Sequence, residues 1–172
     1  VFAGWSYGLP ITGTMAHSYI QAHETEMEAF RRYAELYPGT TLLVDTYDTL
    51  EGVRNVIRLR AELGDAFGVT GIRLDSGDLA DLAVGSRALL DAAGLEQVRI
   101  VASGGLDEHE IAALVGSGAP IDGFGVGTSM GVSKDAPSLD IAYKLTQSAG
   151  EGRLKLWSGK RTIPSPKKLV RR

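Results

Sequence analysis

Residues 69–78 carry the sequence VTGIRLDSGD, in which a short β-rich run, Val69–Asp75, closes on polar and glycine residues. Three further runs have the same form: TLLVDT at Thr41–Thr46, VRIVAS at Val98–Ser103 and IDGFGVG at Ile121–Gly127. Asp75 follows Asp45 by 30 residues, Ser103 follows Asp75 by 28, and Gly127 follows Ser103 by 24. Each interval is the length of one strand, one helix and two short loops, so the spacing predicts repeated βα units.

The segments between these runs have helical periodicity. Apolar positions recur at i, i+3, i+4 and i+7 in two stripes, Leu50, Val53, Val56, Ile57 and Leu63, then Leu79, Leu82, Ala83, Leu89, Leu90 and Ala93. Capping-box patterns at Asp48–Glu51 and Asp107–Glu110 predict helix starts, and Gly64, Gly94 and Gly118 predict helix ends. An earlier helix is predicted from Ser18 to Leu36, with Ile20, Met27, Phe30 and Ala34 facing inward.

The predicted strands are apolar almost throughout, which is typical of a parallel sheet covered by helices. Two α/β architectures fit, a doubly wound open sheet and a (β/α) barrel, and both place their chemistry at the carboxyl ends of the strands. A complete barrel usually needs about 250 residues. A chain of 172 residues is therefore expected to supply part of one.

The end of the chain has a different pattern. Ile141–Thr146 and Arg153–Trp157, separated by QSAGEG, predict a β-hairpin appended to the repeats. Residues 1–143 carry 20 acidic and 9 basic side chains, whereas residues 144–172 carry 1 acidic and 9 basic ones. A basic tail can bind a polyanion, but Pro164 and Pro166 interrupt this one and favour a solvated edge segment over a nucleic-acid surface. We expect a partial barrel over 1–143 and a basic hairpin and tail over 144–172 that leads toward a second domain.

The composition is that of an ordinary globular domain, with 44% hydrophobic and 23% charged residues. The absence of Cys excludes disulfides and thiolate chemistry, and fits a reducing cytoplasm. With no long apolar run and no basic leader before an apolar stretch, we expect no membrane span and no signal peptide. The sequence begins at Val1 rather than Met, so we expect it to be a piece of a longer protein.

Polar and glycine residues follow each predicted strand, in VDTYD, IRLDSGD, SGGLDE and FGVGTS. Arg73 and Asp75 are two residues apart on one strand, so their side chains share a face. There they can hold an anion and accept hydrogen bonds from a diol, or they can form an internal salt bridge. A glycine turn before a helix can cradle a phosphate through backbone N–H groups, or can be turn geometry alone.

His17 lies in GTMAHS, between a segment interrupted by Gly and Pro and a helix. By itself such a residue is more often a packing or surface histidine than a catalytic one. His23 and His109 fall on predicted helices and are expected at the surface. Nothing in their spacing pairs the three histidines as ligands, so no metal site is predicted from side chains alone.

The ordered series GTMAHS, VDTYD, IRLDSGD, SGGLDE, FGVGTS and KLWSGKRTIPSPKK resembles the nicotinate phosphoribosyltransferases, from Ala3 to Lys168. The resemblance implies a type II phosphoribosyltransferase fold, an irregular α/β barrel joined to a second domain. In this family nicotinate displaces diphosphate from 5-phosphoribosyl 1-diphosphate. The product is nicotinate mononucleotide, with coupled ATP hydrolysis and Mg²⁺ on the diphosphate. A cytoplasmic homodimer that binds neither nucleic acid nor membrane is implied.

The resemblance also implies roles for single residues. His17 is the histidine that becomes phosphorylated, and Asp45 orients it or supports Mg²⁺. Arg73 contacts the base or diphosphate, and Asp75 holds the ribose hydroxyls. The 5′-phosphate is cradled by Ser103, Gly104, Gly105, Gly127 and Thr128.

Three alternatives stay open from the sequence. Nicotinamide phosphoribosyltransferase is disfavoured because SGGLDE replaces a GDGVD-type loop, although the residue that recognises the amide lies upstream of this chain. Quinolinate phosphoribosyltransferase needs several basic residues in its base pocket, and the strand ends offer Arg73 alone. A non-catalytic phosphosugar-binding module is the third.

Overall fold

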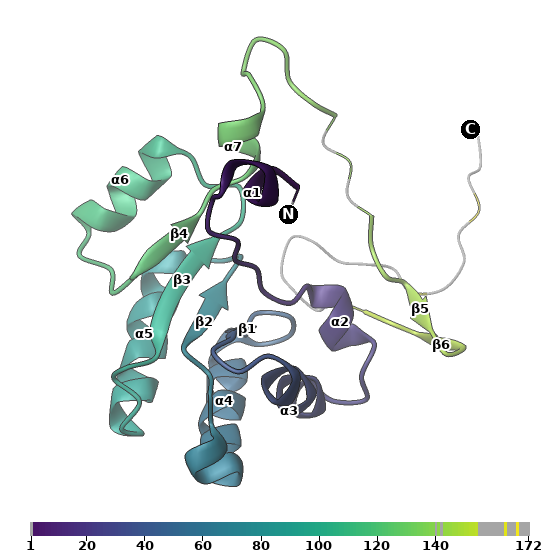
Figure 1. Cartoon of the computed structure of the whole chain (residues 1–172), viewed down its shortest axis with the longest axis vertical. Coiled ribbons are helices and arrows are strands. Elements are labelled where there is room, and N and C mark those ends of the chain that lie inside the picture. Colours follow the sequence, from purple (N-terminus) through teal and green to yellow (C-terminus); the bar gives the residue numbers. More distant parts are fainter. Residues whose placement is uncertain (1, 140, 142, 155–163, 165–167, 169–172) are drawn as a thin grey trace.

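A four-stranded parallel sheet forms the centre of the molecule (Figure 1). The computed structural model describes residues 2–139, 141, 143–154, 164 and 168. The strands lie in chain order, β1 (Thr41–Leu43), β2 (Gly71–Leu74), β3 (Arg99–Ser103) and β4 (Gly123–Gly125). Arg73 is paired with Leu43 on one side and Val101 on the other. The four predicted parallel strands are confirmed, each with narrower limits.

Helices α4 (Thr49–Leu63), α5 (Leu79–Ala92) and α6 (Glu108–Gly116) follow the first three strands. Helix α5 packs on β2 and β3, and α4 packs on both α5 and α3 (Glu26–Leu36). The remaining elements are α1 (Phe2–Tyr7), α2 (His17–Gln21), a 3₁₀ turn (Gly64–Ala66), α7 (Thr128–Gly131), β5 (Gln147–Ser148) and β6 (Glu151–Gly152). The predicted βα repetition is therefore present.

The two faces of the sheet differ in their surroundings. Alternate strand side chains are fully buried together with the inner side of α4, namely Leu42, Val44, Ile72, Leu74, Ile100, Ala102, Val53, Val56 and Leu59. On the opposite face Arg73, Arg99 and Val101 line an open hollow of about 550 Å³ beside the segment 12–14. The described strands form an open sheet, and they do not close a barrel.

Local sequence signals fix the helix starts. Asp107 accepts hydrogen bonds from the backbone N–H groups of His109 and Glu110, and the Glu110 carboxylate accepts one from the Asp107 N–H, a complete capping box. Asp48 likewise accepts from the N–H of Glu51. The predicted starts of α4 and α6 are confirmed.

The single helix predicted over Ser18–Leu36 is wrong. The structure has two helices there, α2 and α3, separated by residues 22–25. Thr25 has extended backbone angles and its hydroxyl accepts from the N–H of Glu28, so it starts a new helix. The apolar pattern of the sequence shows no interruption between the two helices, because Ile20 of α2 and Phe30 of α3 are both buried in the same core.

The predicted hairpin exists, but its strands lie elsewhere. The antiparallel pair β5 and β6 falls inside QSAGEG, with a two-residue turn at Ala149 and Gly150. Both turn residues have positive φ, 50° and 82°, as a tight hairpin turn requires. The described residues of Ile141–Thr146 are not a strand, nor are Arg153 and Leu154, and residues 155–157 lie outside the described part.

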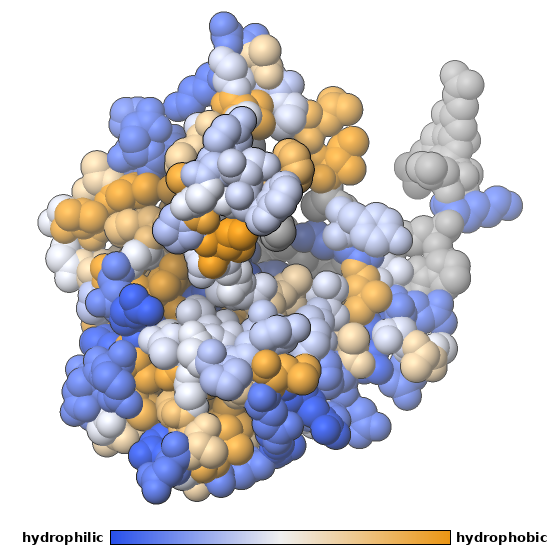
Figure 2. Space-filling view, in the orientation of Figure 1, coloured by the Kyte–Doolittle hydropathy of each residue, from blue (hydrophilic) through white to orange (hydrophobic). Residues whose placement is uncertain are grey.

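Large apolar side chains interrupt the hydrophilic surface (Figure 2). On α1, Phe2, Trp5 and Tyr7 are each more than three-quarters exposed.

Within the part of the chain that the structure describes, no helix is both long enough and apolar enough to cross a membrane.

A buried carboxyl group, that of Glu26, lies where α3 packs on α4. Its Oε2 accepts a hydrogen bond of 2.9 Å from the side-chain amide of Asn55, and its Oε1 is buried without a partner. Burial raises the pKa of Glu26 to about 7, the hydrogen bond from Asn55 opposes the rise, and the charge of Asp45 adds to it. A carboxyl that ionises near pH 7 makes the stability of the fold depend on pH.

We expect Glu26→Gln to stabilise the protein at alkaline pH. Below pH 4.5, the ordinary value, the carboxyl is neutral in the folded and unfolded chain alike. Between pH 4.5 and about 7 the unfolded chain releases the proton and the folded chain keeps it, so the free energy of unfolding falls by up to about 1.4 kcal/mol per pH unit. The neutral amide escapes this fall, and the variant should exceed wild type by about 3 kcal/mol near pH 8.

Urea denaturation across this pH range measures the effect. Glu24→Gln is the matched control, since it removes the same charge from an exposed position just before α3. Stability curves that run parallel for wild type and Glu26→Gln would contradict the expectation.

Candidate active site

The carboxyl ends of β1, β2 and β3 bring together five residues that the sequence analysis singled out. Asp45 follows β1, Asp75 follows β2, Ser103 ends β3, and Arg73 lies within β2. His17 begins α2 and reaches the same place. Because parallel strands end at one edge of the sheet, residues 30 positions apart in the sequence become neighbours.

Asp75 is the centre of this cluster. Its Oδ1 accepts hydrogen bonds from Ser103 Oγ at 2.5 Å and from Arg73 Nη1 at 3.2 Å. Its Oδ2 lies 3.5 Å from His17 Nε2. The carboxylate thus joins three segments that are far apart in sequence.

The electrostatics of the cluster favour the ionised form of Asp75. Burial raises the pKa of Asp75, but hydrogen bonds from His17 and Ser103 and the charges of Arg73 and His17 outweigh it and lower the value to about 2. The side chain is still 28% exposed. Asp75 is therefore an ionised, accessible acceptor at neutral pH.

Arg73 has partners on both sides. Besides Asp75, its Nη1 donates to Ser103 Oγ at 3.3 Å, and its Nη2 donates to the backbone carbonyl of Met15 at 2.9 Å. The guanidinium thereby ties the segment before α2 to the open face of the sheet. The salt bridge with Asp75 is present, and the same arginine lines the 550 Å³ hollow.

The ring of His17 is held from the interior by a residue that the sequence analysis missed. Its Nδ1 lies 3.0 Å from the hydroxyl of Thr46, whose side chain is fully buried. Sequence reasoning assigned the orienting role to Asp45, the preceding residue. The signal that could have found Thr46 is its place in VDTYD, directly after the strand.

Asp45 is fully buried and braces the neighbouring loop. Its Oδ2 accepts from the backbone N–H of Asp75 at 3.1 Å and from the hydroxyl of Ser76, a second residue that sequence reasoning missed. Its Oδ1 is buried without a hydrogen-bond partner. Asp45 thus fixes the backbone that presents Asp75.

The two glycine turns differ in structure. Gly104 has a φ of +99°, and a Cβ atom there would lie 2.0 Å from the carbonyl oxygen of Asp75. Gly105 has a φ of +76° with open space around it. Gly127 has a φ of −119° and lines the hollow that holds Arg73 and Ser103, whereas Thr128 lines a neighbouring hollow beside Lys134. Gly127 and Thr128 therefore face different hollows.

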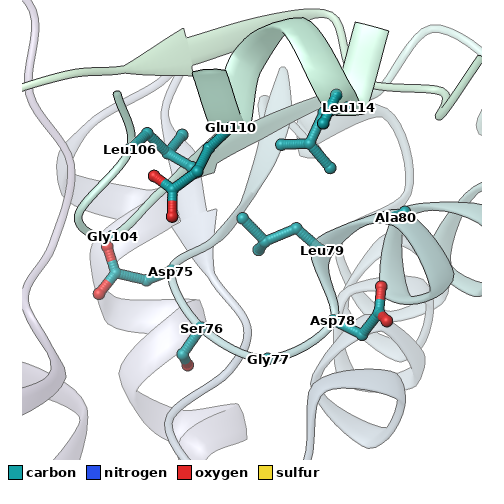
Figure 3. A pocket seen from close by; sticks show the side chains of 11 residues that line it. Asp75, Ser76, Gly77, Asp78, Leu79, Ala80, Gly104, Leu106, Glu110 and Leu114 are labelled. Carbon is teal, nitrogen blue, oxygen red and sulfur yellow. The ribbon is translucent and has the colours of Figure 1, made fainter. Parts of the chain in front are cut away.

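A second hollow, of about 480 Å³, adjoins Asp75 on the helix side (Figure 3). The loop from Asp75 to Asp78 forms one wall and α6 forms the other. Figure 3 shows the carboxylates of Asp75 and Glu110 toward one end and Leu79 and Leu114 toward the other. Asp75 is thus reached from this side.

Known proteins match the chain over nearly its whole length, although no protein-family model does. The nicotinate phosphoribosyltransferase pncB2 of Mycobacterium tuberculosis is 56% identical over 172 residues, which cover 100% of this chain and 37% of that protein. The chain is homologous to the nicotinate phosphoribosyltransferases. The Bacillus subtilis nicotinate phosphoribosyltransferase is 44% identical over 178 residues, or 99% of this chain and 36% of that protein. The resemblance inferred from the motifs is confirmed.

The fold agrees with this homology. A crystal structure of nicotinate phosphoribosyltransferase from Vibrio cholerae matches with a TM-score of 0.74 at 19% identity, over 94% of this chain and 43% of that one. The parallel α/β sheet therefore corresponds to part of the fold of these enzymes. The chain spans little more than a third of the length of the curated relatives named above.

Proposed function

We propose that this chain carries the phosphoribosyl and phosphohistidine sites of a nicotinate phosphoribosyltransferase. The observation that supports this most is the cluster of His17, Arg73, Asp75 and Ser103 at the carboxyl ends of adjacent parallel strands. The reaction joins nicotinate to 5-phosphoribosyl 1-diphosphate, releases diphosphate and uses ATP. It is the first step of NAD salvage from nicotinate.

The proposed role of Asp75 is to accept hydrogen bonds from the ribose hydroxyls. Its low pKa, about 2, keeps it an acceptor at neutral pH. Arg73 and Ser103 donate to one carboxylate oxygen of Asp75, and His17 lies near the other. A ribose diol would compete with His17 for Oδ2, because the 3.5 Å contact of Oδ2 with His17 is longer than both contacts of Oδ1.

Arg73 is proposed to hold an anionic group in the hollow that it lines, as the paired donors of a guanidinium do. The backbone N–H groups after Ser103, at Gly104 and Gly105, precede the capped start of α6 and are suited to the 5′-phosphate. Gly127 lines the hollow that holds Arg73, and Thr128 follows it in the chain. Departure of diphosphate leaves positive charge on the anomeric carbon, so orientation and charge stabilisation are the main tasks of the protein.

The proposal includes Mg²⁺ bound with diphosphate and ATP. Among the described residues, no group of three or more His, Asp or Glu side chains is placed to hold a metal ion by itself. Asp45 has a buried oxygen without a partner, and Asp75 is accessible. This donor set fits an ion that takes most of its ligands from phosphate oxygens and water, with Asp45 or Asp75 in support. When bound, the ion neutralises charge on the departing diphosphate.

His17 is proposed to take the γ-phosphoryl group of ATP. An unprotonated imidazole nitrogen is a competent nucleophile, and the ring is held at a defined position by Thr46. A phosphate on His17 would add negative charge beside the substrate site. ATP hydrolysis would thereby be linked to phosphoribosyl transfer.

The test of the proposal is binding and turnover of 5-phosphoribosyl 1-diphosphate. We expect Asp75→Ala to weaken its binding by roughly 10- to 150-fold, the loss of one charge-assisted hydrogen bond. Isothermal titration measures the affinity, and chromatography of nicotinate mononucleotide measures turnover.

Asp78→Ala is the control for this variant. It removes a carboxylate from the same loop. The Asp78 side chain caps α5 and makes no described hydrogen bond with the cluster around Asp75. Unchanged binding in Asp75→Ala would mean that the carboxylate serves the sheet wall alone. Because this chain spans little more than a third of its relatives, the full-length protein is used, and binding without any turnover there would favour a non-catalytic phosphosugar-binding module.

A further inference from the structure

A smaller hollow, of about 140 Å³, lies beside the start of α2. His17 and Gln21 line it from α2, and Lys144 lines it from the segment 143–145. His17 borders neither of the larger hollows next to Asp75 and Arg73. The fold therefore places a lysine from the far end of the described chain in one hollow with the candidate phosphohistidine.

Lys144 is the cation of this hollow. It is exposed, and it takes part in no ion pair within the part of the chain that the structure describes. Arg73, by contrast, already pairs with Asp75 and donates to Ser103 and to the carbonyl of Met15. An ammonium group has three donors and no acceptor, so Lys144 is suited to an anion that enters the hollow.

Gln21 gives a second, independent sign that the hollow takes an acceptor. The residue is only 4% exposed, and its amide nitrogen is buried without a hydrogen-bond partner among the described residues. Buried donors in native proteins are normally paired. An anion with several oxygen atoms would supply acceptors for both Gln21 and Lys144.

The size of the hollow limits what that anion is. A water molecule takes up roughly 30 Å³, so 140 Å³ holds about four or five of them. A phosphoryl group, with one phosphorus and three oxygen atoms, is of this size, whereas a whole nucleotide is far larger. The volume therefore fits the group that is transferred and excludes the rest of the donor.

We propose that the hollow lined by His17, Gln21 and Lys144 receives the phosphoryl group transferred to His17, and that Lys144 binds this group. The inference rests on the proposed function and adds to it a residue outside the strand-end cluster. A phosphate on His17 lies close to the ionised carboxylate of Asp75, which is 3.5 Å from the ring, and the two negative charges repel. The positive charge of Lys144 offsets that repulsion.

The transfer step balances in bonds and protons. The lone pair of an unprotonated ring nitrogen of His17 forms a bond to the γ-phosphorus of ATP, while the bond from this phosphorus to the bridging oxygen breaks. The electron pair of the broken bond leaves with ADP, and the other ring nitrogen keeps its proton. Lys144 stays protonated and donates to the phosphoryl oxygens, so it stabilises charge and transfers no proton.

Substitutions at position 144 of the full-length protein test this. With γ-labelled ATP, Lys144→Gln should label His17 about tenfold more slowly than wild type, the low end for a lost charge-assisted hydrogen bond because Lys144 is exposed. Lys144→Arg keeps the charge and should stay within about threefold of wild type. Arg32→Gln is the matched control, since Arg32 of α3 is also an exposed cation without an ion pair among the described residues. It should label at the wild-type rate.

A second measurement needs no turnover. Inorganic phosphate is the probe, and the NMR signals of the His17 ring report whether it binds beside them. Phosphate should shift these signals in wild type and in Arg32→Gln, and Lys144→Gln should need about tenfold more phosphate for the same shift. All of these variants should melt as wild type does, because the replaced side chains are exposed and make no ion pair in the described structure.

The outcomes separate the two proposals. Equal labelling rates in Lys144→Gln and wild type, equal slowing in Arg32→Gln, or His17 signals that phosphate leaves unchanged in wild type each overturn the role of Lys144. If wild type takes up no label but phosphate still shifts the His17 signals in a way that depends on Lys144, the phosphorylation of His17 fails and the anion site at Lys144 is supported.

Discussion

Incubated with γ-labelled ATP, the full-length protein should acquire an acid-labile, base-stable phosphate, and its His17→Asn variant should acquire none. Phosphorus bound to nitrogen has this stability, and asparagine offers no nucleophilic nitrogen at the position. Loss of the label should be complete, because the other two histidines of the sequence, His23 and His109, make their described contacts outside the cluster at the strand ends. The measurement is retention of label after acid and alkali treatment.

The other two histidines supply the controls. His23 lies beyond α2 with its Nδ1 2.8 Å from the carbonyl of Tyr19, and His109 is exposed on α6. His23→Asn and His109→Asn should therefore label as wild type does. Label that persists in His17→Asn would show that His17 is not the phosphorylated residue. Label lost in His109→Asn would assign the phosphate to that exposed histidine instead.

The second large effect is expected at Gly104. A methyl group there would lie 2.0 Å from the backbone oxygen of Asp75, and a φ of +99° strains any residue with a side chain. The backbone at Asp75 must move to admit the methyl group, because no flexible side chain can give way. Gly104→Ala should therefore lower the free energy of unfolding by on the order of 4 kcal/mol. The displaced loop takes Asp75 away from Ser103, and affinity for 5-phosphoribosyl 1-diphosphate should fall as well.

Gly105→Ala separates the two contributions. Gly105 also has positive φ, but nothing lies within 4 Å of its added Cβ atom. It should lose about 1 kcal/mol, the cost of the left-handed conformation alone. Thermal unfolding of both variants measures the difference, and equal melting temperatures would show that the contact with the Asp75 backbone adds no cost.

The helices, and the strands between them, could be predicted because hydrophobic periodicity and helix capping are local signals. Asp48 and Asp107 cap their helices through residues three positions away, so the sequence carries the whole signal. The cluster followed from topology, since Asp45, Asp75 and Ser103 end adjacent parallel strands.

What sequence reasoning missed depends on contacts between distant segments or on single backbone conformations. Thr46 meets His17 across 29 positions, and its place in VDTYD indicates a strand end without indicating that His17 is its partner. The break before α3 depends on Thr25, whose capping competes with a continuous apolar stripe. The hairpin strands lie closer to the turn than predicted because Ala149 adopts a positive φ, which alanine seldom does.

Asp75 draws its partners from α2, β2 and β3, which gives the cluster a place in the folding reaction. Its contacts with Ser103 and His17 cannot form until β3 has docked on β2 and α2 has reached the end of the sheet. Closing the segment from His17 to Asp75 also requires ordering more than 50 intervening residues. The full set of contacts around Asp75 is therefore completed late in folding, and a spectroscopic probe at His17 would report on that final step as well as on the chemistry of the site.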